Sequence, residues 1–264
     1  MARWRQIGDI WQLDPDLARP SRGTIEFIGG SYLAATPQLS YRRLLEALVG
    51  LGWQVKAWSY VPGFDHQDQA NAAWRSFRAA RSDGPAPLRL GHSLGCKLHL
   101  LAPDAGRNSS ALVALSFNNF SAERSVPLLA ELGQQFGFRS EFSPSPAATL
   151  EQVRQVYGQP RNLLVRFAQD RIDQSARLLD ALTSRERDAS ELRELPGDHL
   201  SPASAGLRRQ MLGAWADDPG RAEHIDRLVT LITDWGEAGA GAAPGRDQRR
   251  RTPEPPPAGR SVSR

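Results

Sequence analysis

The sequence predicts an α/β fold, a three-layer sandwich in which helices cover both faces of a mostly parallel sheet. Two observations support this prediction. Segments that are almost entirely apolar alternate along the chain with amphipathic helical segments, which is typical of parallel strands buried on both faces. The 264 residues, of which 40% are hydrophobic, suffice for one sizeable core, so we expect a single domain.

Five short runs of aliphatic and aromatic residues predict strands. These strands are expected at residues 24–28, 53–60, 87–90, 111–117 and 162–167. Apolar residues at helical spacing predict the helices between and after the strands. These helices are expected at residues 37–49, 66–81, 96–102 and 221–235. Asp65 is suited to cap the second helix, because its side chain can accept a hydrogen bond from a free N–H of the first turn.

The net charge of +4 is concentrated near the C-terminus. From Gly236 onward the chain consists largely of Gly, Ala, Pro and Arg, a composition that cannot bury enough apolar area to offset the entropy of ordering. We therefore expect a domain at residues 1–236 and a disordered tail at residues 237–264. An Arg-rich tail can contact nucleic acid or an anionic surface. A solubilising extension is the favoured interpretation, and we expect no nucleic-acid partner.

Three features of the sequence bear on its compartment. It contains no run of about 18 apolar residues, so no membrane span is expected. Residues 1–5 lack the apolar core of a signal peptide. Cys96 is the sole cysteine, which excludes an internal disulfide and is typical of a reducing compartment. These observations favour a cytoplasmic protein.

Residues 91–95, Gly-His-Ser-Leu-Gly, form the most specific chemical motif of the chain. Gly-x-Ser-x-Gly between a strand and a helix indicates a nucleophile elbow, a sharp turn that exposes the serine hydroxyl at the end of a sheet. Gly91 and Gly95 are needed there because a Cβ would collide with the neighbouring strand or helix. The motif predicts Ser93 as a nucleophile, provided that the rest of the chain supplies a base and an oxyanion site.

A nucleophilic serine needs a histidine as general base and a carboxylate that orients it. In hydrolases with a nucleophile elbow these residues follow in the order Ser, Asp or Glu, His. Asp170 comes directly after the last predicted strand, and His199 lies in a Pro-Gly loop within an otherwise helical, charged stretch. The sequence therefore predicts Ser93, Asp170 and His199 as a catalytic triad, with Asp173 as the alternative acid.

The other four histidines have simpler interpretations. His66 and His224 lie on predicted helices and are expected to be solvated. His92 is inside the elbow, where its side chain is expected to point away from Ser93. His99 lies on the helix after the elbow and is expected to be packed or solvated. His199 remains as the candidate base.

The oxyanion site is expected to use two backbone N–H groups. One is that of Leu94, directly after the nucleophile, and the other comes from the glycine turn, at Gly30 or Ser31. An ordinary tight turn is the alternative interpretation of these glycines. Asn118 and Asn119 follow a predicted strand and are expected to line the pocket. We expect neither a metal nor a cofactor.

Several segments of the chain share features with one family: residues 27–30, 36–42, 64–66, 91–101, 116–119 and 196–202. They resemble an uncharacterised family of cyanobacterial and plastid proteins regarded as α/β-hydrolase-like, the domain of unknown function 1350. The resemblance spans residues 4 to 235. It implies an α/β-hydrolase fold, no known substrate, and a location in a cyanobacterial cytoplasm, or in a plastid if the source is a plant.

The expected function is that of a serine hydrolase acting on an ester or thioester of a small or medium acyl group through an acyl-enzyme. Residues 118–160 are expected to form at most a small lid, which favours a small-molecule acyl substrate over a polymer. An acyltransferase would use the same acyl-enzyme. The alternative from another class is a non-catalytic protein that binds a ligand or partner, with a role in pigment or photosystem maintenance. The sequence leaves the oligomeric state open.

Overall fold

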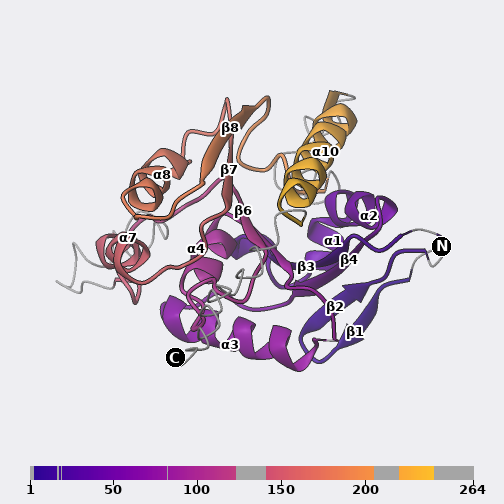
Figure 1. Ribbon diagram of the computed structural model, residues 1–264, viewed down its shortest axis with the longest axis horizontal. Coiled ribbons are helices and arrows are strands. Elements are labelled where there is room, and N and C mark those ends of the chain that lie inside the picture. Colours follow the sequence, from indigo (N-terminus) through magenta and orange to yellow (C-terminus); the bar gives the residue numbers. More distant parts are fainter. Residues whose placement is uncertain are drawn as a thin grey trace, which may run out of the picture.

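An eight-stranded sheet organises the part of the chain that the structure describes, with strand order β1-β2-β4-β3-β5-β6-β7-β8 (Figure 1). This computed structural model describes residues 3–122 except 17, 19 and 82, residues 141–204 and residues 220–240. The strands are β1 (Arg5–Ile7), β2 (Ile10–Leu13), β3 (Gly23–Ile28), β4 (Trp53–Trp58), β5 (Leu88–His92), β6 (Ala111–Leu115), β7 (Asn162–Phe167) and β8 (Glu191–Leu195). Strands β3 to β8 run parallel to one another, whereas β1 and β2 form an antiparallel hairpin at the edge, in which β2 pairs antiparallel with β4.

Helices cover both faces of this sheet (Figure 1). They are η1 (Ser31–Leu33), α1 (Pro37–Ser40), α2 (Arg42–Gly50), α3 (His66–Ala79), α4 (Leu94–Leu100), α7 (Pro146–Gln155), α8 (Ser175–Thr183) and α10 (Gly220–Ala240). Alternate residues of a strand point to opposite faces. On β6, Val113 packs in the cluster that includes α2 and α10, whereas Leu112 and Ala114 pack with α4, α7 and α8. The three-layer α/β architecture expected from the sequence is therefore confirmed.

The predicted helix at residues 37–49 is interrupted at Tyr41, which has φ −121° and ψ 20° between α1 and α2. Tyr41 is fully buried, and its hydroxyl accepts a hydrogen bond from Gly30 N–H at 2.8 Å. The apolar spacing of the sequence predicts one continuous helix, because the break at Tyr41 depends on a contact with the glycine turn.

The charged stretch before His199, expected to be helical, contains strand β8. Its sequence, Glu-Leu-Arg-Glu-Leu, is partly exposed at the edge of the sheet, and charged side chains on an edge strand protect it from pairing with another chain. Helical spacing and an edge strand are difficult to distinguish in five such residues. This strand matters for the site, because its end leads directly into the loop that carries His199.

Parts of the expected lid and tail lie outside the described residues, namely residues 123–140 and 241–264. Within the lid segment, α7 packs Val153 into the same core cluster as Leu178 of α8, so this helix belongs to the layer that covers the sheet. Helix α10 extends to Ala240, four residues into the expected tail. None of the helices in the described ranges has the length and apolarity that a membrane span requires.

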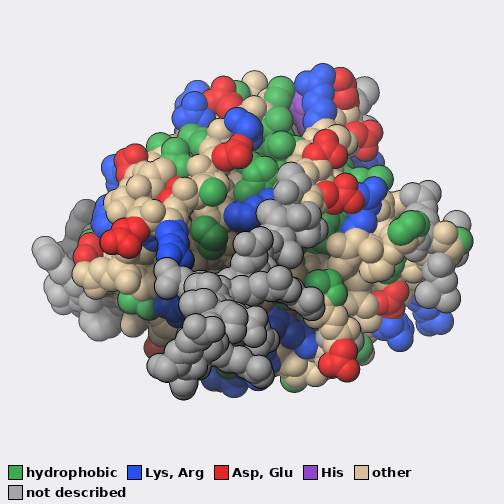
Figure 2. Space-filling view, in the orientation of Figure 1, with side chains coloured by type: hydrophobic (Ala, Val, Ile, Leu, Met, Phe, Trp, Pro, Cys, Tyr) green, Lys and Arg blue, Asp and Glu red, His purple; other side chains and the backbone are tan. Residues whose placement is uncertain are grey.

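Acidic and basic side chains are interspersed on the face shown in Figure 2 and form no continuous area of one sign there. Alternating charges of this kind are typical of a solvated protein surface.

Candidate active site

The chain turns sharply at Ser93, between the end of β5 and the start of α4. Ser93 has φ 53° and ψ −119°, an unusual conformation for a residue with a side chain, and its N–H donates to Leu115 O of β6 at 2.9 Å. A Cβ on Gly91 would lie 2.6 Å from Cys96 N, and one on Gly95 would lie 2.0 Å from Ile28 O. Both glycines are therefore required for the predicted reason, the close approach of backbone to backbone.

Replacing Gly95 by alanine is expected to destabilise the protein by about 3 kcal/mol or more, because backbone atoms of β3 would have to move. Gly50→Ala is the matched control, since a Cβ on Gly50 meets no heavy atom within 4 Å in the described structure. Gly50 ends α2, so its substitution is expected to leave stability unchanged or raise it by up to about 1 kcal/mol. Urea unfolding followed by circular dichroism measures both effects, and equal midpoints would contradict the packing argument.

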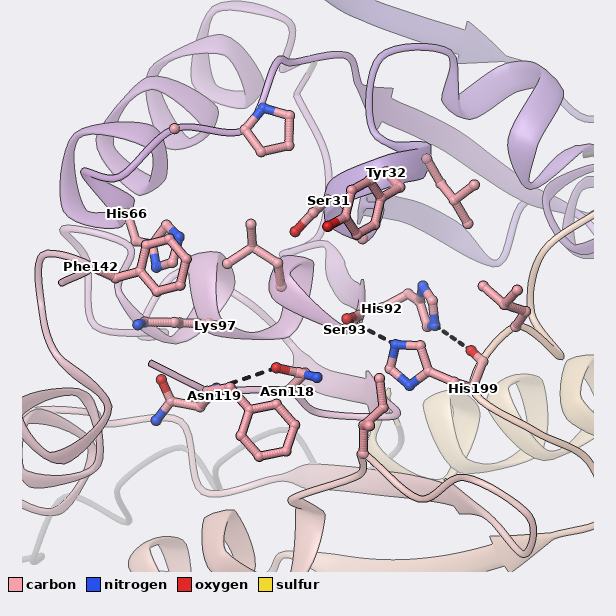
Figure 3. A pocket seen from close by; sticks show the side chains of 18 of the residues that line it. Ser31, Tyr32, His66, His92, Ser93, Lys97, Asn118, Asn119, Phe142 and His199 are labelled. Carbon is pink, nitrogen blue, oxygen red and sulfur yellow. Dashed lines mark hydrogen bonds between the residues drawn. The ribbon is translucent and has the colours of Figure 1, made fainter. Parts of the chain in front are cut away.

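Three side chains from distant parts of the sequence meet at the C-terminal edge of the sheet. Ser93 follows β5, Asp170 follows β7 and His199 lies in the loop after β8. With Nδ1 protonated, His199 donates to Asp170 Oδ2 at 2.7 Å. Its Nε2 accepts from the Ser93 hydroxyl at 3.0 Å, the bond drawn in Figure 3. This arrangement has the geometry of a serine, histidine and aspartate triad.

The two candidate acids have different partners. The side chain of Asp170 is fully buried and also accepts from Ile172 N–H at 3.0 Å. Burial favours a higher pKa for Asp170, but hydrogen bonds from the His199 ring and from Ile172 outweigh it and lower the pKa below its usual value. Asp173 accepts instead from Ser175 N and Ser175 Oγ at the start of α8, and burial raises the pKa of Asp173. Of the two, Asp170 is the carboxylate in contact with His199.

A buried chain of hydrogen bonds connects the glycine turn to the His199 loop. Gly30 N–H donates to Tyr41 Oη, the Tyr41 hydroxyl donates to His92 Nδ1, and His92 Nε2 donates to His199 O, each at 2.8 Å. These roles follow from one another, because a carbonyl oxygen can only accept. Both ring nitrogens of His92 are thus engaged with Tyr41 and with the backbone of His199, so His92 supports the loop of His199. Sequence reasoning missed this function of Tyr41 and His92, for which no motif exists.

These hydrogen bonds correct the prediction of one oxyanion donor. The N–H of Gly30 is engaged with Tyr41 Oη, so it does not face a substrate. Ser31 and Leu94 are the first residues of η1 and α4, and the N–H groups at the start of a helix have no partner within that helix. Both residues line the same cavity as Ser93. Ser31 and Leu94 therefore remain as the candidate donors.

The cavity at this site has a volume of about 620 Å³, enough for a small or medium organic molecule. Its walls are largely apolar, with Leu33, Phe64, Leu94, Phe120, Phe142 and Ile172 among them. Asn118 and Asn119 line it, where the sequence predicts them. The Asn119 amide is fixed by donating to Pro146 O at 2.9 Å.

The side chains of His66 and Asp65 lie near this site. The expectation that His66 is solvated is wrong: it is 4% exposed and stacks on Phe142, and burial lowers its pKa to about 3. The segment around Phe142 packs against the start of α3, and helical periodicity cannot reveal a contact with residues so distant in sequence. The capping role of Asp65 is confirmed by a hydrogen bond of 2.8 Å from Asp68 N–H to Asp65 Oδ1.

Solved structures with the same architecture include several hydrolases. A monoacylglycerol lipase from Paleococcus ferrophilus has a TM-score of 0.57 and 16% identity, with 86% of this chain and 99% of that chain covered. A lidless serine hydrolase from Xanthomonas campestris has a TM-score of 0.54 and 15% identity, with 92% and 96% covered. A thioesterase domain from the curacin biosynthetic pathway has a TM-score of 0.53 and 12% identity, with 89% and 99% covered. At these identities the likeness establishes the fold.

Sequence comparison adds the family. A search of curated proteins finds no match. The model of a family described as a protein of unknown function, DUF1350, matches residues 3–217. The cyanobacterial or plastid source expected from the resemblance stays a prediction. Because the match covers most of the sequence, the chain belongs to the DUF1350 family, and the structure shows that it has the α/β-hydrolase fold.

Proposed function

We propose that the protein is a serine hydrolase that cleaves an ester or thioester of a small or medium acyl group. The observation that carries this proposal is the continuous line of hydrogen bonds from Ser93 through His199 to Asp170, which opens onto an apolar cavity. A serine on an elbow with no base nearby would have no such reactivity.

The geometry supports a two-step reaction. His199 Nε2 takes the proton of Ser93 as Oγ attacks the substrate carbonyl carbon, and the charged ring is stabilised by Asp170. The N–H groups of Leu94 and Ser31 would hold the negative oxygen of the tetrahedral intermediate. His199 then returns the proton to the departing alcohol or thiol, which leaves Ser93 acylated. A water molecule, deprotonated by His199, releases the acid and restores the hydroxyl.

The lipase, serine hydrolase and thioesterase named above are consistent with this reaction class. The cavity volume supports a small or medium acyl group. An acyltransferase would form the same acyl-enzyme and would differ in accepting an alcohol, amine or thiol in place of water.

Labelling with a fluorophosphonate probe tests the proposal, because such probes phosphonylate activated serines. We expect the wild-type protein to be labelled in minutes, with the adduct on Ser93 in a peptide mass spectrum, and Ser93→Ala to remain unlabelled. Absence of labelling in both proteins, or equal labelling of both, would contradict the proposal and favour a non-catalytic binding protein.

A further inference from the structure

The end of the cavity remote from His199 contains a buried lysine. Lys97 is 1% exposed and lines the cavity from α4, one helical turn after Ser93 (Figure 3). Its ammonium group donates to Pro144 O at 3.0 Å and lies 5.9 Å from the ring of Phe142. An ammonium group can donate three hydrogen bonds. Among the described residues, no carboxylate forms a direct ion pair with Lys97, although the charge of Glu141 acts on it from a greater distance. Lys97 thus has donor capacity to spare in apolar surroundings.

A second polar group at this end of the cavity also has unused hydrogen-bonding capacity. His66 is 4% exposed and lines the cavity from the first turn of α3. No hydrogen-bond partner of its Nδ1 is present in the described part of the chain, although this atom is buried. A buried polar atom left unpaired costs about 1–3 kcal/mol, so such atoms usually have a function or a ligand. Because its pKa is lowered to about 3 by burial, the ring is neutral and can donate through Nδ1.

This end of the cavity is a built structure and not an open surface. Ser143 N–H donates to Phe64 O, and Gln67 N–H donates to Ser143 O, which holds the segment around Phe142 against the start of α3. The ring of His66 stacks on Phe142 with 4.2 Å between centroids. Lys97, His66 and Phe142 therefore lie together at one end, as Figure 3 shows.

We propose that Lys97 and His66 form a subsite for a carboxylate carried by the acyl group of the substrate. The proposal rests on the proposed hydrolase function and names its substrate class, a monoester or monothioester of a short dicarboxylic acid. A buried charge is stable only when it is paired or hydrogen-bonded, and a carboxylate completes both groups. Its oxygens would accept from Lys97 Nζ and from His66 Nδ1. The acyl chain between the two ends would lie along Leu94.

The spacing along α4 favours a short acyl group. Four residues of α-helix rise about 6 Å, so the Lys97 backbone lies about that far from Ser93 along the helix axis. A short dicarboxylate such as glutarate is of the same order of length, whereas a fatty acyl chain would leave the ammonium group buried against methylene groups. Asn119 Oδ1 is also buried, with no hydrogen-bond partner among the residues that the structure describes, and as an acceptor it disfavours a carboxylate beside it. The carboxylate is therefore assigned to the side of Lys97 and His66.

Two esters of equal chain length test the subsite: mono-p-nitrophenyl glutarate, which carries the carboxylate, and p-nitrophenyl pentanoate, which does not. For wild type we expect the higher kcat/KM on the glutarate. In Lys97→Met this value falls by about 10- to 100-fold, the effect of a lost charge-assisted hydrogen bond. The value on the pentanoate changes by less than about 3-fold, because methionine keeps the volume of the side chain.

Arg171→Met is the matched control. Arg171 also lines the cavity but is exposed, so solvent screens its charge. We expect its substitution to change the preference for the glutarate by less than about 3-fold. Equal losses on both esters in Lys97→Met, or a larger loss in Arg171→Met, would overturn the proposal. The first result would show that Lys97 only anchors Pro144.

The preference should also depend on pH. Burial lowers the pKa of Lys97 to about 8, although the charge of Glu141 acts in the opposite direction. Glu141 and His66 are the titratable groups that interact with Lys97, and His66 stays neutral throughout this range. As the pH rises through about 8, Lys97 loses its proton, and the ratio of the two kcat/KM values should fall toward that of Lys97→Met. A pH-independent ratio in wild type would contradict the assignment.

Binding to an inactive protein separates the two proposals. We expect monomethyl glutarate to raise the Tm of Ser93→Ala but not that of Ser93→Ala/Lys97→Met. Methyl pentanoate should change the Tm of both proteins by the same amount. A Tm shift without fluorophosphonate labelling of wild type would refute the hydrolase and retain the carboxylate subsite. Labelling without a Tm shift or an ester preference would retain the hydrolase and refute the subsite.

Discussion

Replacing Ser93 by alanine is expected to lower kcat for p-nitrophenyl ester hydrolysis by at least about 10⁴-fold. The substitution removes the atom that would form the proposed acyl-enzyme, and His199 would then have no hydroxyl to deprotonate. Residual hydrolysis would come from water activated by His199 and from the N–H groups of Ser31 and Leu94. Steady-state kinetics with enzyme at micromolar concentration can measure rates over this range.

The loss must come from chemistry and not from unfolding. Ser93 already has a positive φ, so alanine adds no new backbone strain there. Its hydroxyl makes one hydrogen bond to His199, and we expect the free energy of unfolding to change by less than about 1.5 kcal/mol. Retention of more than about a tenth of the wild-type kcat in the folded variant would exclude Ser93 as the nucleophile.

Asp170→Asn is expected to lower kcat by about 10³- to 10⁴-fold while leaving the protein folded. The amide nitrogen of asparagine donates, and it favours the tautomer of His199 with its proton on Nε2. In that form Nε2 faces the Ser93 hydroxyl with a hydrogen and can no longer act as the base. The measurement is kcat on p-nitrophenyl butyrate, together with loss of fluorophosphonate labelling.

Asp173→Asn is the matched control, because it changes the neighbouring carboxylate that contacts Ser175. We expect its kcat to stay within about 3-fold of wild type and its stability to fall by about 1 kcal/mol, since a hydrogen bond at the start of α8 is weakened. A large loss of kcat in Asp173→Asn, with a small loss in Asp170→Asn, would reverse the assignment of the acid.

The two carboxylates also differ in how they affect acid unfolding. The pKa of Asp170 is lower in the folded protein than in the unfolded chain, so its ionised form contributes stability above the unfolded pKa. This contribution is lost as the pH falls through the folded pKa. The pKa of Asp173 is raised in the folded protein, so the ionisation of Asp173 lowers stability as the pH rises. Asp170→Asn should therefore make stability less sensitive to acid, as measured by urea unfolding between pH 3 and 6.

Much of the fold follows from local patterns. The strands β3 to β7 coincide closely with five apolar runs of the sequence, because strands buried on both faces consist almost entirely of apolar residues. The hairpin β1–β2 and the edge strand β8 do not have this composition. They lie toward the edges of the sheet, where exposed faces admit polar residues, and they were not expected.

The sequence by itself determined the elbow at Ser93, since two glycines around a serine have a local steric cause. It also placed Asp170 and His199 after strands or in loops in the expected order. Only the tertiary structure showed that Asp170 contacts His199 whereas Asp173 contacts Ser175, because these partners depend on how β7, β8 and α8 pack together.

The same holds for the groups around the triad. The hydrogen bonds of Tyr41 and His92 exclude Gly30 as an oxyanion donor, and the burial of Lys97 and His66 creates the polar end of the cavity. These residues are far apart in sequence and have no local motif. Burial and partner choice are properties of packing in three dimensions, so one-dimensional periodicity does not contain them.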